Sequence, residues 1–87
     1  MSISHVFDTH ATTTKGKVIH FDVVLDEQDA EKALACAKQW LKSIGEADAI
    51  VDSRTCLFCH SAQAPADLRA QIDSQGYAIY KMEGCPK

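Results

Sequence analysis

The strongest indication of architecture comes from the segment Lys17-Val18-Ile19-His20-Phe21-Asp22-Val23-Val24-Leu25. Every second residue from Ile19 to Leu25 is apolar, and the polar residues His20 and Asp22 lie between them. An alternation with a period of two is typical of a β-strand that buries one face. We therefore predict a strand over residues 17–25.

The residues before this segment predict a partner strand. Residues 3–9 are rich in β-branched and aromatic side chains, and residues 11–16 have the composition of a polar turn. Together the two segments predict a β-hairpin, with His10 at its solvated turn. His20 and Asp22 share one face of the second strand, where they are interpreted as an exposed surface pair or as an acid–base pair.

After the hairpin the sequence predicts a helix that ends at Gly45. Asp26 offers a side-chain oxygen to the first N–H groups, and acidic residues follow where the helix dipole favours negative charge. Apolar residues then recur at spacings of three, four and seven, namely Ala30, Ala33, Leu34, Ala37, Leu41 and Ile44. Cys36 lies at the flank of this apolar face and is interpreted as a small buried hydrophobe.

The second half of the chain predicts a strand, a loop, a helix and a strand. Residues 47–52 suit a short third strand, whereas residues 54–64 show neither helical nor strand periodicity. Pro65 and Gly76 bound a helix of about eleven residues, and residues 77–82 are apolar on both faces, as in an interior strand. The predicted fold is α+β: two layers in the order ββαβαβ, with a four-stranded mixed sheet and two helices on one face.

Composition restricts the class of protein. The chain has 87 residues, which predicts one domain over 1–87, and its 46% hydrophobic and 24% charged residues are typical of a globular protein. Nine Lys and Arg against twelve Asp and Glu give a net charge of −3, which disfavours nucleic-acid binding. No apolar run approaches the roughly 20 residues that span a bilayer. The first residues lack the features of an export signal, so a cytoplasmic location is expected.

The cysteines carry the most specific chemical signal. In a reducing compartment, thiols more often bind metal, react or pack in a core than form disulfides. Cys56-Leu57-Phe58-Cys59 has the two-residue gap that lets both sulfurs face one tetrahedral ion. The sequence predicts a zinc site formed by Cys56, Cys59, His60 and Cys85, with His5 or water as alternatives to His60.

This metal site depends on topology. If both helices connect parallel strands, then strands two, three and four end at the same edge of the sheet. That edge would bring the Cys56–His60 segment to Cys85.

Three other interpretations remain open. Cys56 and Cys59 are spaced for thiol–disulfide exchange, although no predicted helix begins at either thiol to lower its pKa. The same motif with His60 matches a c-type haem attachment site, with Met82 as distal ligand, but haem attachment normally follows export. A structural or protein-interaction domain with reduced cysteines is the third. The sequence does not decide whether the chain is an enzyme, and it indicates no substrate or partner.

Several segments resemble a small bacterial family catalogued as a domain of unknown function. The resemblance is carried by Val6-Phe7-Asp8-Thr9, by His20-Phe21-Asp22-Val23, by Cys56-Leu57-Phe58-Cys59-His60, and by the C-terminal run Gln75-Gly76-Tyr77-Ala78-Ile79-Tyr80-Lys81-Met82-Glu83-Gly84-Cys85-Pro86. It implies a two-layer α+β fold with the order given above and no established activity or cofactor. In that family an aromatic residue tends to stand at the position of His10, which argues against a site built around this histidine.

Overall fold

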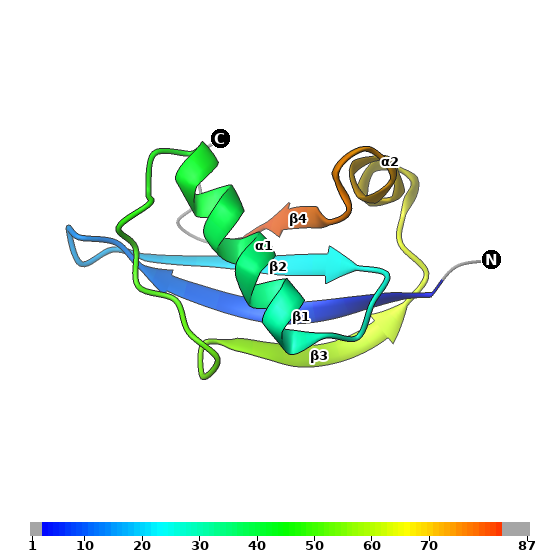
Figure 1. Ribbon diagram of the computed structural model, residues 1–87, viewed down its shortest axis with the longest axis horizontal. Coiled ribbons are helices and arrows are strands. Elements are labelled where there is room, and N and C mark those ends of the chain that lie inside the picture. The colour runs from blue at the N-terminus through cyan, green and yellow to red at the C-terminus, as the bar shows by residue number, and fades with distance from the viewer. Residues whose placement is uncertain (1–2, 83–87) are drawn as a thin grey trace.

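The computed structural model describes residues 3–82 and shows an α+β fold with the predicted order of elements (Figure 1). The elements are β1 (Ser4–Thr12), β2 (Val18–Leu25), α1 (Ala30–Ser43), β3 (Cys56–Ala62), α2 (Ala66–Gln75) and β4 (Ala78–Lys81). The four strands form one sheet in the order β3-β1-β2-β4. The predicted fold class is therefore confirmed.

The pairing of the strands differs from the prediction, because the sheet is antiparallel and not mixed. β2 and β3 do run in the same direction, as expected for strands joined by a helix, but β1 lies between them. β4 runs opposite to β2 and ends beside His20, where the Met82 N–H donates to the His20 carbonyl at 3.0 Å. β3 ends beside Ser4, at the other end of the sheet. Strands two, three and four therefore do not end at one edge.

Two strands have different bounds from those predicted. The third strand is Cys56–Ala62 and not residues 47–52, of which Ile50 forms an isolated bridge with Thr12. β3 lies at an edge of the sheet, and all its residues after Cys56 are exposed, so its sequence has no alternating buried face. β1 continues to Thr12, which places His10 within the strand and not in a turn.

Helix α1 covers one face of the sheet (Figure 1). Its N-cap is Asp29 and not Asp26, because the Asp29 carboxylate accepts the N–H groups of Glu31 and Lys32 at 3.0 and 3.2 Å. The helix ends before Gly45, as predicted. The main core lies between α1 and the sheet and includes Phe7, Phe21, Val23, Leu25, Ala33, Trp40 and Leu41.

Helix α2 packs on the opposite face, so the prediction of two helices on one face is wrong. Leu68 and Ile72 form a second core cluster with Val6, Val24 and Ala78. Successive side chains of a strand point to opposite faces, so Val6 and Val24 face away from α1. We call this side of the sheet the α2 face; it carries the even-numbered residues of β1 and β2. No helix within residues 3–82 has the length and apolar character to cross a membrane.

Candidate functional site

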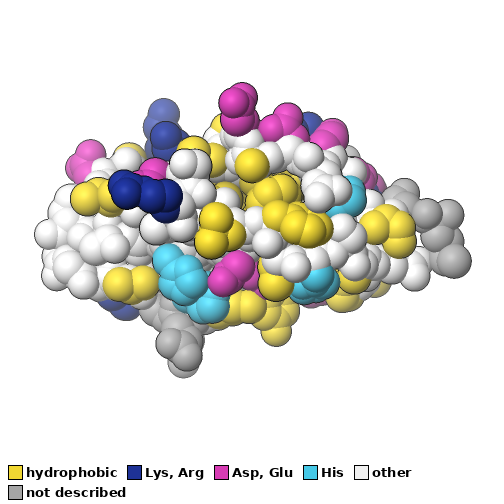
Figure 2. Space-filling model, turned by 90° about the horizontal axis from the view of Figure 1, so that it is seen from below, with side chains coloured by type: hydrophobic (Ala, Val, Ile, Leu, Met, Phe, Trp, Pro, Cys, Tyr) yellow, Lys and Arg dark blue, Asp and Glu magenta, His cyan; other side chains and the backbone are white. Residues whose placement is uncertain are grey.

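The β1–β2 hairpin places a group of polar side chains on the α2 face. Its register pairs Asp8 with Asp22 and His10 with His20. All four residues have even numbers, so their side chains share this face. Seen from below the view of Figure 1, histidine side chains lie next to an acidic side chain among hydrophobic ones (Figure 2). The hairpin register therefore creates a polar cluster on an otherwise largely apolar surface.

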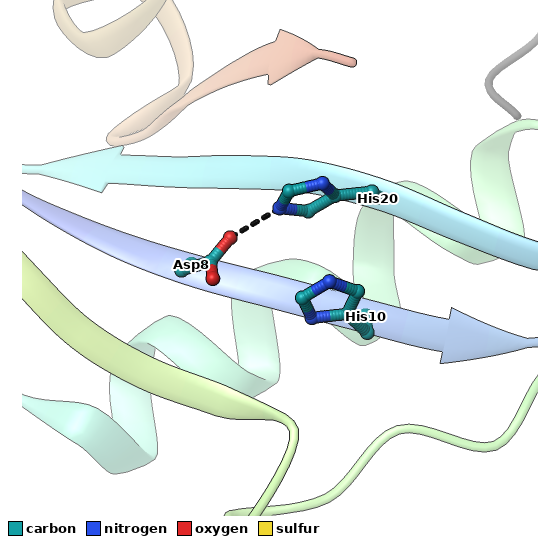
Figure 3. Close-up of side chains that lie close together, drawn as sticks. All are labelled: Asp8, His10 and His20. Atoms are coloured by element: carbon teal, nitrogen blue, oxygen red, sulfur yellow. Dashed lines mark hydrogen bonds and ion pairs between the residues drawn. The ribbon is translucent and has the colours of Figure 1, made fainter. Parts of the chain in front are cut away.

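Asp8, His10 and His20 form the centre of this cluster (Figure 3). One ligand atom from each, a carboxylate oxygen or an imidazole nitrogen, lies within 4.8 Å of the others. The His20 Nε2 contacts the Asp8 Oδ1 in both hydrogen-bond and ion-pair geometry. The rings of His10 and His20 stack, with centroids 4.1 Å apart and planes at 13°. One possible ligand atom of each side chain therefore lies close to those of the other two.

Asp22 and His60 extend the cluster toward α2. Burial, followed by the negative charge of Asp8, raises the pKa of Asp22, while the nearby His20, His60 and His10 act in the opposite direction. His60 comes from β3, where it pairs with Val6. The cluster thus combines two carboxylates with three imidazoles contributed by three strands.

A pocket of about 190 Å³ opens beside the cluster, between the sheet and the beginning of α2. Asp22 and His60 belong to both the cluster and the lining of the pocket. Most of the remaining wall is apolar and includes Val6, Val24 and Leu68. The pocket and the Asp8–His10–His20 group are therefore neighbours on the same face.

The structure separates the two cysteines of the Cys-x-x-Cys motif. Cys56 is 3% exposed and packs in the core under α1, where burial raises the pKa of its thiol. Its Sγ lies 3.4 Å from the Thr9 hydroxyl, which donates to it. Cys59 is exposed, and its Sγ lies 3.2 Å from the Nδ1 of His60, which lines the pocket on the α2 face. One thiol of the motif is therefore in the core and the other is at the surface.

A β-bulge explains the position of Cys59. The register of β1 and β3 shifts between Val6 and Phe7, so that Phe7 pairs with Phe58 and Val6 pairs with His60. Cys59 is the extra residue on β3. The bulge places Cys59 and His60 together opposite Val6.

The predicted zinc ligands are only partly within the described residues, because Cys85 lies outside them. Within residues 3–82, the group of His, Cys, Asp and Glu side chains close enough to share an ion contains no cysteine. His5, the alternative fourth ligand, has its Nδ1 2.7 Å from the Ser61 hydroxyl. The four-ligand site that includes Cys85 stays a prediction.

Sequence reasoning missed the Asp8–His10–His20 group. The sequence gives Asp8 no role and pairs His20 with Asp22 alone. It predicts that His10 lies in a solvated turn, and the family resemblance argues against a site at this histidine. The chemistry of the group is nevertheless well defined, since imidazole and carboxylate ligands suit zinc and other first-row divalent ions. Three protein ligands also leave a coordination position for water or a small molecule.

Comparison with known proteins places this chain in a family. The structure is similar to the NMR structure of protein NE1680 from Nitrosomonas europaea, a Northeast Structural Genomics Consortium target, with a TM-score of 0.86. The two chains are 51% identical over 97% of this chain and 99% of that one. No curated protein sequence matches the chain. The family model described as Domain of unknown function (DUF2024) matches residues 1–82, and the chain therefore belongs to that family.

Proposed function

We propose that this domain binds a divalent transition metal ion, zinc above all, through Asp8, His10 and His20. The observation that carries the proposal is the convergence of their ligand atoms to within 4.8 Å of one another. Zinc lies about 2 Å from nitrogen and oxygen ligands, so ligand atoms around it are roughly 3.4 Å apart. To bind one ion, the stacked His10 and His20 rings would also have to turn so that a nitrogen of each faces it.

The contact between His20 and Asp8 supports this assignment. The His20 Nε2 contacts the Asp8 carboxylate, so an imidazole nitrogen and a carboxylate oxygen already face each other, and metal ligands must be deprotonated. Binding would then release protons and would weaken as the imidazoles become protonated at low pH. Asp22, which pairs with Asp8 across the hairpin, adds negative charge beside the ion.

The cysteine-based interpretations receive less support from the arrangement of the described residues. A zinc site that includes Cys56, or a disulfide between Cys56 and Cys59, would require the Cys56 side chain to leave the core under α1. The histidine cluster needs no such rearrangement. A structural role fits Cys56 well, because it packs among apolar residues as a small hydrophobe.

Isothermal titration calorimetry with zinc and the chelator-treated full chain tests the proposal. We expect one zinc per chain, and we expect His20→Ala to lower the affinity by at least about a hundredfold. His5→Ala is the matched control, since His5 lies on the same strand but faces the other side of the sheet. The His5→Ala chain should bind zinc with the same affinity as the unmodified chain.

A triple variant with serine at Cys56, Cys59 and Cys85 separates the two possible ligand sets. If the histidine cluster holds the ion, this variant keeps the zinc affinity of the unmodified chain. Loss of zinc binding in the triple variant, with full binding retained in His20→Ala, would show that the cysteines are the ligands and would refute the proposal.

A further inference from the structure

The pocket on the α2 face has a floor formed by the sheet and a wall formed by the segment that leads into α2. Its apolar lining consists of Val6, Val24, Ala62, Ala64, Pro65 and Leu68. Val6, Val24 and Leu68 also belong to the second core cluster, so this part of the lining is fixed by packing. An apolar group in the pocket would therefore meet a preformed surface.

The size of the pocket limits its ligand. Its volume is about 190 Å³. A protein cavity of about 150 Å³ accommodates benzene, so this pocket suits a body of roughly six to ten non-hydrogen atoms. The ligand is thus a small organic molecule and not a nucleotide or a peptide.

The charged residues that line the pocket indicate which polar group the ligand carries. Its polar lining consists of Asp22, His60, Gln63 and Tyr80, and among the described residues no Lys or Arg lines it. Asp22 therefore brings a carboxylate to the pocket, and Asp8 stands directly opposite Asp22 on the neighbouring strand. A carboxylate at one end of an apolar pocket whose described lining holds no Lys or Arg favours a cationic group.

We propose that this pocket binds a small primary amine in its protonated form. The ammonium group donates hydrogen bonds to the Asp22 carboxylate, and the apolar body packs between Val24 and Leu68. Tyr80, which pairs with Asp22 from β4, also lines the pocket. The proposal goes beyond metal binding and does not rest on it, because none of the three proposed metal ligands lines the pocket.

An NMR titration with three matched compounds tests this inference on the full chain in excess chelator. Benzylammonium, benzyl alcohol and benzoate have the same apolar body and carry positive, zero and negative charge. We expect benzylammonium to shift the amide signals of Val6, Val24 and Leu68. Benzyl alcohol should bind about tenfold more weakly, and benzoate should cause no shift.

Two variants and one control locate the interaction. Asp22→Asn should lower the affinity for benzylammonium about tenfold and leave that for benzyl alcohol unchanged. Ala64→Leu places a larger side chain in the pocket and should lower the affinity for both compounds. Asp48→Asn makes the same charge change at an exposed residue outside the pocket lining and should alter neither.

Three results would overturn the inference: equal binding of benzoate, unchanged benzylammonium affinity in Asp22→Asn, or no shift with any compound. Because the titration is done without metal, its outcome is independent of the zinc experiment. Amine binding in a chain that fails to bind zinc would refute only the metal proposal, and zinc binding without amine binding would refute only this one.

Discussion

Arg69 of α2 binds Asp26, the residue after β2, through two parallel hydrogen bonds. Its Nη1 donates to Oδ1 at 3.0 Å and its Nη2 donates to Oδ2 at 2.7 Å. The Ser4 hydroxyl donates to the same Oδ1 at 3.0 Å. The hydrogen bond from Arg69, assisted by that from Ser4, lowers the pKa of Asp26. Helix α2 has only two buried residues, Leu68 and Ile72, and this ion pair adds a polar contact between the helix and the sheet.

Asp26→Asn is expected to lower the thermal unfolding midpoint at neutral pH by roughly 2–6 °C. The lowered pKa of Asp26 means that its ionised form stabilises the folded chain at every pH above the unfolded value of about 3.9. This contribution is lost as pH falls through the folded pKa. Circular dichroism melts from pH 7 to pH 2 should show the difference between the two chains disappear at the acidic end.

Asp73→Asn is the control for this prediction. Asp73 also bonds Arg69, but through one hydrogen bond of 3.2 Å and with a side chain that is 68% exposed. Asp73→Asn should therefore lower the unfolding midpoint less than Asp26→Asn does. An equal effect of both variants would show that the Arg69–Asp26 pair has no special role in holding α2.

Zinc should stabilise the folded chain against heat. An ion that binds only the folded state adds about 2.7 kcal/mol at a free concentration of one hundred times its dissociation constant. For a domain of this size that corresponds to an increase of roughly 10 °C or more in the unfolding midpoint. Differential scanning fluorimetry should show this increase for the unmodified chain and for His5→Ala but not for His20→Ala. A similar increase in His20→Ala would contradict the assigned ligands.

The contact between Phe21 and Trp40 should be central to stability. Phe21 is fully buried, and its ring centroid lies 4.5 Å from that of Trp40 on α1. Phe21→Leu removes this contact and leaves a small cavity, which should cost about 1–2 kcal/mol. The chain has one tryptophan, so its fluorescence reports urea unfolding directly. Val18→Ala, at a position that is 51% exposed, should have almost no effect.

The described cysteines should react at different rates with iodoacetamide. Cys59 is exposed, whereas Cys36 and Cys56 are buried and burial raises the pKa of both thiols. Because the thiolate is the reactive form, the two buried thiols should react at least about tenfold more slowly in the folded chain. Peptide mass spectrometry after timed labelling measures each rate separately. Fast labelling of Cys56 would show that the core under α1 opens readily.

The sequence predicted those elements whose side chains carry a clear period. β2 alternates, α1 has a continuous apolar face, and both helices end at glycines with positive φ, Gly45 and Gly76. β3 was missed because its strand character comes from pairing with β1, which leaves all residues after Cys56 exposed. β3 pairs antiparallel with β1 at the edge of the sheet. This pairing joins residues that are far apart in the sequence, so the local periodicity of either segment does not predict it.

The candidate site could have been found from a symmetry in the hairpin. Asp8-Thr9-His10 and His20-Phe21-Asp22 are mirror images about Lys15. A hairpin that turns at Lys15 pairs Asp8 with Asp22 and His10 with His20. All four polar side chains then lie on one face of the sheet. The prediction differs from the structure because it ends the first strand at residue 9 and places His10 in the turn, whereas β1 continues to Thr12. The cysteine motif, in contrast, has a familiar spacing, but Cys56 lies in the core and Cys59 is the exposed bulge residue of β3.

The bulge that places Cys59 opposite Val6 also shapes the outer boundary of the sheet. An edge strand with exposed apolar side chains such as Leu57 and Phe58 is a template on which identical chains can stack into fibres. An inserted residue breaks the regular ladder of peptide groups and increases the local twist. We therefore expect the irregularity that brings Cys59 next to His60 to disfavour self-association along β3.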